Sequence, residues 1–231
     1  MDRRIRAACE RSGRSRGDVG IVAVTKYVST ERTLQVLRSG LRHLGENRWP
    51  DAETKWNAVT SASNGDNAVG QAVWHFIGSL QSRKVKDVVG RFHYLHSVDR
   101  IGLAEAVSKR ASQLGITVPC FLQVNVSGEE SKHGVRPGEL RALAQGAAAL
   151  PGIRIEGLMT MAPAADEPEE TRPVFRGLRE LRDELNASGV LPYAVNGLSM
   201  GMSGDFEVAV EEGATWLRLG TILVGKEEDG A

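Results

Sequence analysis

Short apolar runs rich in branched residues alternate with longer amphipathic stretches along most of this chain. Residues 19–25 (VGIVAVT) form the first such run, without the polar alternation of a half-exposed strand. Continuous apolar runs of this length are typical of parallel strands that are buried on both faces. The pattern predicts eight strands, at residues 19–25, 43–45, 74–78, 93–98, 120–126, 153–159, 197–200 and 216–220.

Amphipathic stretches of helical length separate these predicted strands. Ser29 and Thr30 have the residue type of helix N-caps, and Gly115 and Gly189 stand where helices are expected to stop. Residues 58–72 are small and polar, and they predict a flexible surface loop. The predicted helices are 3–13, 31–39, 48–58, 81–89, 100–114, 137–149, 168–188 and 205–212.

The strict alternation of strands and helices implies a parallel sheet. Eight strand–helix units in 231 residues fit a single (β/α)8 barrel, a TIM-type α/β fold. A doubly wound open sheet is the alternative. No linker and no internal repeat divides the chain, so we expect one domain over residues 1–231, with a flexible tail at 226–231.

Composition narrows the classes of function. The 29 basic and 29 acidic residues cancel, which argues against a broadly basic surface for nucleic acid. No apolar run approaches the roughly 20 residues that a membrane-spanning helix needs. Cys9 and Cys120 lie far apart and form no CxxC pair, so a reducing cytoplasm is expected. The histidines lack the spacing of metal ligands, and no metal is expected.

Lys26 directly follows the first apolar run. In a barrel, the carboxyl end of a strand opens into the active site. A lysine desolvated there has a lowered pKa and can form a Schiff base with a carbonyl group. A lysine that extends from a strand end into water fits the same position. Only 7 of the 29 basic residues are lysines, which adds some weight to the functional interpretation.

Two further segments carry the chemistry of phosphate binding. Residues 197–205 (GLSMGMSGD) form a turn rich in glycine and serine between a strand and a helix, and residues 218–221 (RLGT) end the last strand. Backbone N–H groups and hydroxyls in such turns bind phosphate, and barrels often do so after strands seven and eight. Each segment alone is typical of an ordinary turn. Together with Lys26 they predict a phosphorylated carbonyl cofactor, for which pyridoxal 5'-phosphate (PLP) is the obvious candidate.

Other polar residues are less decisive. Asn47 follows the second strand and either reaches the barrel mouth or caps the next helix. His75 lies inside a predicted strand, where a histidine is more often a hydrogen-bonded core residue than a catalyst. Lys132 follows the fifth strand and fits either the barrel mouth or an exposed loop.

Several ordered motifs together resemble one known family. The resemblance runs from Val19 to Gly225, nearly the whole chain, and identifies the pyridoxal-phosphate homeostasis protein family (the YggS type). It implies a single barrel like the N-terminal domain of alanine racemase, in the fold-type III group of PLP-dependent proteins. The motifs are residues 22–26 (VAVTK), 45–48 (GENR), 74–78 (WHFIG), 96–100 (HSVDR), 123–125 (QVN), 157–159 (GLM), 198–203 (LSMGMS) and 218–221 (RLGT).

The resemblance also implies a role for each site residue. Lys26 holds PLP as an internal aldimine, and Asn47 lies beside the cofactor ring. Arg218 contacts the cofactor through its phosphate or its ring nitrogen. Known members of the family bind the cofactor without an established catalytic turnover. The residues implied to hold the phosphate are Ser199, Met200, Gly201, Met202, Gly220 and Thr221.

Two classes of function follow: a carrier that stores, shields or delivers PLP to apo-enzymes, and an amino-acid racemase or decarboxylase. A racemase needs an acid or base on each face of the Cα–H bond. The resemblance implies that in alanine racemase the second group is a tyrosine from an extra domain of the partner subunit. We expect no such domain in this chain. Tyr27 is expected to point away from Lys26 along an extended backbone. An arginine at the ring nitrogen would weaken the electron sink.

We therefore expect a cytoplasmic, monomeric PLP carrier without catalytic residues. In a carrier, the cofactor must leave the barrel for client apo-enzymes that depend on PLP. Lys132 is the candidate for a way-station at the rim of the barrel mouth.

Overall fold

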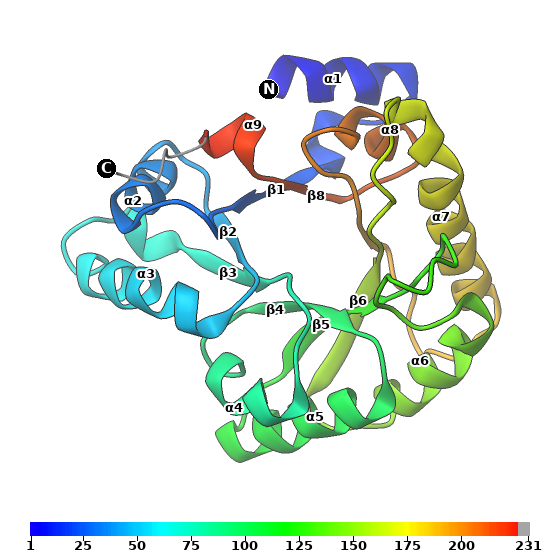
Figure 1. Cartoon of the computed structure of the whole chain (residues 1–231). Helices are drawn as coiled ribbons and strands as arrows, with labels where there is room; N and C mark the ends of the chain where they lie inside the picture. Colours follow the sequence, from blue (N-terminus) through cyan, green and yellow to red (C-terminus); the bar gives the residue numbers. More distant parts are fainter. Residues whose placement is uncertain (226–231) are drawn as a thin grey trace.

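The computed structural model describes residues 1–225. Its parallel strands close into a barrel in the order of the sequence, and the predicted tail at 226–231 lies outside the described residues (Figure 1). The barrel closes where Gly20 pairs with Trp216, so the predicted (β/α)8 fold is confirmed and the open sheet is wrong. The strands are β1 (Gly20–Val24), β2 (His43–Glu46), β3 (Val73–Phe76), β4 (Tyr94–Val98), β5 (Val118–Gln123), β6 (Ile153–Met159), β7 (Gly197–Ser199) and β8 (Trp216–Leu219).

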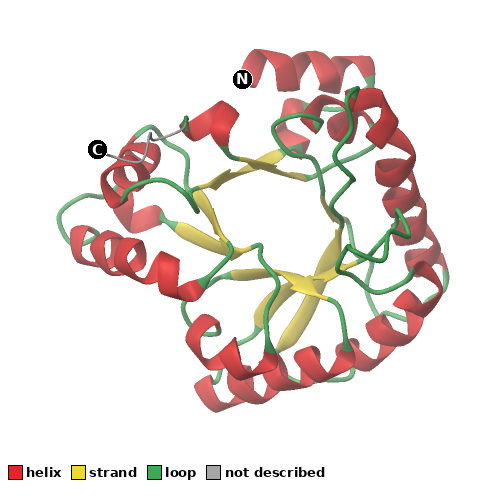
Figure 2. Cartoon of the chain, in the orientation of Figure 1, coloured by secondary structure: helices red, strands yellow, loops and turns green. Residues whose placement is uncertain are grey.

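Helices form an outer ring around the strands (Figure 2). Each longer helix turns an apolar stripe inward; one of them, over residues 101–114, buries Leu103, Val107 and Ala111 at helical spacing. The α-helices are α1 (Asp2–Arg11), α2 (Thr30–Arg38), α3 (Trp49–Ala62), α4 (Val85–Val88), α5 (Ile101–Leu114), α6 (Leu140–Ala148), α7 (Arg172–Ala187), α8 (Phe206–Glu211) and α9 (Thr221–Val224). Short 3-10 helices are η1 (Arg16–Asp18), η2 (Val69–Gln71), η3 (Ser82–Lys84), η4 (Pro137–Glu139) and η5 (Pro168–Thr171).

Local signals fix several helix ends as the sequence predicts. The Ser29 hydroxyl accepts a hydrogen bond from the backbone N–H of Arg32 at 3.1 Å and so caps α2. Gly115 adopts a φ of 65° after α5, a left-handed conformation that glycine reaches without steric cost.

The segment 58–72 differs from the flexible loop that its composition predicts. Helix α3 continues to Ala62 and buries Val59, and Val69 of η2 is fully buried as well. The hydroxyls of Thr60 and Ser63 donate to backbone carbonyls four residues earlier, at 2.8 and 2.7 Å, so these residues fit a helix end. Two buried valines therefore anchor a stretch whose other residues are small and polar.

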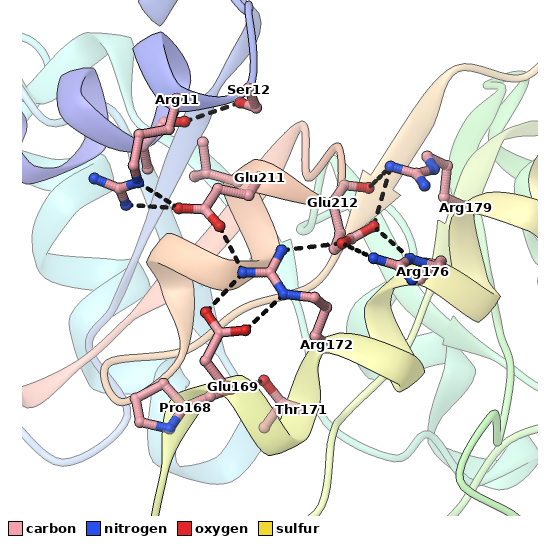
Figure 3. A network of polar contacts seen from close by, with 12 residues as sticks. Arg11, Ser12, Pro168, Glu169, Thr171, Arg172, Arg176, Arg179, Glu211 and Glu212 are labelled. Atoms are coloured by element: carbon pink, nitrogen blue, oxygen red, sulfur yellow. Dashed lines mark hydrogen bonds and ion pairs between the residues drawn. The ribbon is translucent and has the colours of Figure 1, made fainter.

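A network of ion pairs fastens α1 to the barrel through α7 and α8 (Figure 3). The carboxylate of Glu212, directly after α8, is almost fully buried. Glu211 lies 2.6 Å from Arg11 of α1, which carries the network across to the N-terminal helix. One side of α1 also packs its apolar residues inward, among them Ile5 and Cys9. Three arginines of α7 surround the Glu212 carboxylate at 3.0–3.1 Å: Arg172, Arg176 and Arg179.

None of the helices within residues 1–225 is both long enough and apolar enough to cross a lipid bilayer.

Candidate cofactor site

A cavity of about 750 Å³ opens at the carboxyl ends of the strands. This is the end at which barrels carry their functional sites, and the volume lies in the usual range for small-molecule sites. Its lining comes from several strand ends that are distant in the sequence. Polar residues of β5 and β8, of the segments that follow β1, β2 and β5, and of α9 meet there: Lys26, Asn47, Gln123, Lys132, Arg218 and Thr221.

The structure brings together most of the residues expected to form the site. The residues that line the cavity as expected are Lys26, Asn47, Met202, Arg218, Gly220 and Thr221. Ser199 and Met200 are instead fully buried, and Gly201 is buried beside them. Ser203 and Gly204 line the cavity, although sequence analysis did not assign them. They continue the same glycine- and serine-rich turn, which was the signal that could have found them.

The turn after β7 owes its shape to Gly201 and Asp205. Gly201 has a φ of +92°, and a Cβ added there would lie 2.6 Å from the Cβ of Ala209, so glycine is required. Asp205 Oδ1 accepts a hydrogen bond from the backbone N–H of Met202. The backbone N–H of Asp205 donates to the Met202 carbonyl at 3.2 Å. Closed in this way, the turn directs Ser203 to the cavity.

Lys26 lies in a turn directly after β1. The backbone N–H of Val28 donates to the carbonyl of Thr25 at 3.1 Å and closes that turn. The Lys26 Nζ is 4.7 Å from the centre of the Tyr27 ring, and both residues line the cavity. The expectation that Tyr27 points away from Lys26 was therefore wrong. Side chains alternate between faces only along extended backbone, and the chain is no longer extended after Thr25.

A buried ion pair contacts Thr25, the residue before Lys26. Glu46, at the end of β2, is fully buried, and its Oε1 lies 2.9 Å from the Nζ of Lys55 of α3. The Thr25 hydroxyl donates to the same Oε1 at 2.7 Å, and Lys55 also donates to the Thr25 carbonyl. Glu46 and Lys55 thus fix both the side chain and the backbone of the residue before Lys26. Sequence analysis missed Lys55 because its partner is contributed by another element.

Asn47 is held in place by Gly78 at the end of β3. A Cβ added to Gly78 would lie 2.2 Å from the Asn47 carbonyl oxygen, a separation that real Cβ atoms do not show. Glycine at this position therefore allows the two chain segments to pack directly against each other. This contact keeps Asn47 at the mouth, where it lines the same cavity as Lys26.

Arg218 of β8 brings a buried positive charge to the floor of the cavity. Its side chain donates to the Ser199 hydroxyl oxygen at 2.7 Å and to the Thr160 carbonyl at 2.9 Å. Burial lowers the pKa of Arg218 to about 10. The guanidinium is therefore still charged at neutral pH, and its two fixed hydrogen bonds set its orientation.

Below Arg218, three histidines and Ser199 form a hydrogen-bonded column. His43 Nδ1 lies 2.9 Å from His75 Nε2, and His75 Nδ1 lies 2.8 Å from His96 Nε2. His96 Nδ1 lies 2.8 Å from the Ser199 hydroxyl oxygen. His75 and His96 are fully buried, so His75 is the hydrogen-bonded core residue that its place in a strand suggests. We refer to His43, His75, His96 and Ser199 as the histidine column.

The two buried rings of the column predict loss of stability in mild acid. Burial holds the pKa of His75 and of His96 well below the ordinary value. The unfolded chain takes up protons on these rings below about pH 6.5, whereas the folded chain does not, so stability falls as pH falls through that value. We expect the free energy of unfolding to drop by about 2–3 kcal/mol between pH 7.5 and 5.5.

Urea unfolding at the two pH values measures this effect. Carboxylates of ordinary pKa stay ionised throughout this pH window, so the histidines dominate it. An unchanged slope against urea serves as the control that the unfolded state is the same. A difference below about 1 kcal/mol would show that the two rings are protonated in the folded protein.

Comparison with known proteins defines the class first. The family described as "Alanine racemase, N-terminal domain" matches residues 1–228. An alanine racemase of Clostridium difficile 630 has the same fold, with a TM-score of 0.74 and 17% identity, over 99% of this chain and 56% of that one. The fold and the cavity at its mouth thus define a barrel of the alanine racemase N-terminal type.

Closer relatives identify the family. A pyridoxal phosphate homeostasis protein of Aquifex aeolicus is 42% identical over 97% of this chain and 94% of its own length. Another, of Pseudomonas aeruginosa, is 39% identical over 99% of this chain and 93% of its own. PipY of Synechococcus elongatus, solved with PLP bound, has a TM-score of 0.80 at 34% identity, covering 96% and 99% of the two chains. This chain belongs to the pyridoxal phosphate homeostasis protein family.

Proposed function

We propose that this protein binds PLP and serves its homeostasis, holding the cofactor as a reversible Schiff base on Lys26 and delivering it to apo-enzymes. One observation carries the proposal: the primary amine of Lys26, the guanidinium of Arg218 and the hydroxyl of Thr221 line a single cavity. An amine next to donors for an anion is the chemistry that a phosphorylated aldehyde requires. The names of its relatives and the PLP bound to PipY support the same function.

The residues present fit PLP in charge and in space. Ser203 and Thr221 place hydroxyls in the cavity, and Arg218 adds a positive charge. Gly204 and Gly220 leave the backbone open to a ligand: a Cβ at Gly204 would meet nothing within 4 Å. Such turns bind phosphate through backbone N–H groups and hydroxyls. When bound, PLP supplies the aldehyde, and this chain supplies the amine, the anion donors and the enclosing walls.

Two observations favour a carrier over a racemase or decarboxylase. Lys26 and Tyr27 lie in one turn with their side chains in contact, whereas racemisation needs groups on opposite faces of the substrate. Arg218 stays charged at neutral pH and is fixed by Ser199 and Thr160. Arg218 therefore keeps its protons and does not give one to a ring nitrogen. A ring nitrogen that stays unprotonated would weaken the electron sink that catalysis needs. We place this carrier in the cytoplasm as a monomer, in keeping with the free, buried Cys9 and Cys120.

The test is the visible absorbance spectrum of the protein with PLP, before and after borohydride, followed by peptide mass mapping. We expect a band that disappears on reduction and a pyridoxyl mass on the peptide that contains Lys26. Absence of any band after addition of PLP would refute the proposal. Incubation of the loaded protein with single-enantiomer amino acids then separates the two classes, because a racemase or decarboxylase would convert them.

Lys132 provides a separate prediction about release of the cofactor. Its loop is tied down at two points: Asn125 donates to the Lys132 carbonyl at 3.3 Å, and Gln123 donates to the His133 carbonyl at 3.1 Å. The loop thereby holds a second amine at the cavity that contains Lys26. We propose that Lys132 accepts the aldehyde in passing, and we expect Lys132→Ala to slow transfer several-fold.

The measurement is the rate at which loaded protein reactivates a PLP-dependent apo-enzyme. Lys109→Ala, which removes an exposed amine of α5 that does not line the cavity, is the matched control and should transfer at the wild-type rate. Equal rates for Lys132→Ala and the wild type would remove Lys132 from the pathway.

A further inference from the structure

The histidine column runs through the interior of the barrel from one end to the other. His43 stands at the start of β2, and Ser199 stands at the end of β7. His96 and Ser199 belong to β4 and β7, which are not neighbours, so their hydrogen bond crosses the lumen. The ring of Trp216 in β8 likewise reaches across, 4.7 Å from the ring of His43 and 5.2 Å from that of His75. The column therefore connects the end opposite the cavity with the cavity floor.

Arg218 determines the direction of the hydrogen bonds in this column. A guanidinium can only donate, so the Ser199 oxygen accepts from Arg218. Among the described residues, His96 Nδ1 is the remaining partner of the Ser199 hydroxyl, so the hydroxyl proton is donated to Nδ1, which must be unprotonated. A neutral imidazole carries its one proton on the other nitrogen, so His96 donates from Nε2 to His75 Nδ1. By the same rule His75 donates from Nε2 to His43 Nδ1.

The far end of the column is the part that meets solvent. His43 is only half-buried, in contrast to His75 and His96. The titratable and charged groups that act on its ring are His75 of β3, His93 just before β4, and Arg42 beside it in the chain. Burial and the charges of His93 and Arg42 lower the pKa of His43 below its ordinary value. His43 therefore takes up its proton at a lower pH than an ordinary histidine does.

We propose that the histidine column is a polarised hydrogen-bond chain that positions the Ser199 hydroxyl beneath Arg218, and that protonation of His43 reverses the direction of the whole chain. A protonated His43 carries hydrogens on both nitrogens and can only donate to His75. His75 must then present an unprotonated Nε2 and donate from Nδ1 to His96. His96 in turn donates from Nδ1 to the Ser199 oxygen.

The proton balance of this reversal is simple. One proton from solvent is added, and it resides on His43. His75 and His96 keep one proton each, moved from Nε2 to Nδ1. Ser199 keeps its hydroxyl proton, but its oxygen now accepts from both His96 and Arg218. The hydroxyl must therefore donate to a different acceptor.

The consequence for the cofactor rests on the proposed function. Arg218 lines the cavity, and Ser199 lies directly beneath it at 2.7 Å. Reversal turns the hydrogen-bond dipoles of the column so that their positive ends face Ser199 and Arg218, and an acceptor atom of PLP beside Arg218 would stabilise that arrangement. Protonation of His43 and binding of PLP are thus expected to favour each other, and such a coupling is reciprocal.

Imidazole ¹⁵N NMR of the protein without PLP, from pH 8.5 to pH 5, tests the column directly. The ¹⁵N shift distinguishes a protonated ring nitrogen from an unprotonated one. We expect His75 and His96 to carry their protons on Nε2 at pH 8.5 and on Nδ1 once His43 is charged. A proton on Nδ1 of His96 at pH 8.5 would overturn the proposal. So would titration of His43 without a change at the two buried rings.

Two variants separate coupling from a local effect. His43→Asn places an amide oxygen near the position of Nδ1 but cannot be protonated, so His75 and His96 should keep Nε2–H at every pH. Arg218→Met removes the donor that polarises the chain, so His96 should populate both tautomers. An unchanged His96 in Arg218→Met would refute the assigned polarity. Should that variant fail to fold, the wild type and His43→Asn still decide the matter.

PLP titration distinguishes failure of this proposal from failure of the proposed function. For the wild type and for His43→Asn, we divide the PLP affinity at pH 5 by the PLP affinity at pH 8. Groups that titrate in both proteins affect both ratios equally, so they cancel when the two ratios are compared. The ratio for the wild type should be at least about threefold higher than the ratio for His43→Asn, which corresponds to about 0.7 kcal/mol. Equal ratios would show that the column does not reach the cofactor. Absence of PLP binding in both proteins would refute the proposed function, while the NMR result would stand.

Discussion

Replacing Lys26 with alanine is expected to abolish both the visible band with PLP and the borohydride-reduced adduct. A Schiff base needs a primary amine at the right position, and Lys26 supplies it directly after β1. Thr221, Ser203 and Arg218 remain in the variant, so weak non-covalent binding of PLP should persist. Absorbance titration, intact mass after reduction and calorimetry of PLP binding measure the three quantities separately.

Two control variants isolate the role of the amine. Lys26→Arg keeps the positive charge but does not condense with an aldehyde, so it should lose the band as Lys26→Ala does. Lys132→Ala removes the second amine of the cavity and should retain a full adduct on Lys26. A full adduct in Lys26→Ala would mean that another lysine holds the cofactor, and the mapped peptide would identify it.

Exchanging Lys55 for methionine is expected to lower the free energy of unfolding by about 3–5 kcal/mol. The change keeps the length of the side chain but leaves the fully buried Glu46 without its cation. Glu46 Oε2 already has no hydrogen-bond partner among the described residues, so the remaining stabilisation of this carboxylate comes from Lys55 and Thr25. Urea unfolding at pH 7.5 measures the loss.

The double variant Glu46→Leu/Lys55→Met is the decisive control. It removes both charges, and an apolar pair in place of a buried ion pair is often neutral or stabilising. We expect it to recover at least half of the loss seen in Lys55→Met alone. Strict additivity of the two single variants would instead show that the ion pair carries no coupling. The Lys26 adduct of each variant reports whether Thr25 has moved, since Thr25 contacts both partners.

Most of the fold could be predicted because its signals are local. Most strands are short apolar runs, and caps or glycines bound the helices between them, such as Ser29 before α2 and Gly115 after α5. A parallel sheet of eight strand–helix units leaves few arrangements other than a closed barrel. The error at residues 58–72 arose because small polar residues suit a helix end as well as a loop. Only the burial of Val59 and Val69 separates the two.

Part of the site could be predicted for the same reason. Lys26, Arg218 and Thr221 lie within two residues of the carboxyl end of a strand, and carboxyl ends of parallel strands meet at one end of a barrel. Ser199 and Met200 belong to the same segment as the cavity-lining Met202 and Ser203 but are buried in the core. The side to which each residue of a turn points depends on backbone dihedrals that residue types do not specify. The predicted direction of the Tyr27 side chain was wrong for the same reason.

The sequence by itself determined the barrel, the approximate strand ends and the position of Lys26, Arg218 and Thr221 at its mouth, because these follow from apolar periodicity and residue type over short stretches. Only the tertiary structure decided which buried groups meet. His43, His75 and His96 come from three different strands, and Glu46 and Lys55 from a strand and a helix. Their hydrogen bonds cross between elements, so their partners are set by the closure of the barrel and leave no periodic trace along the chain.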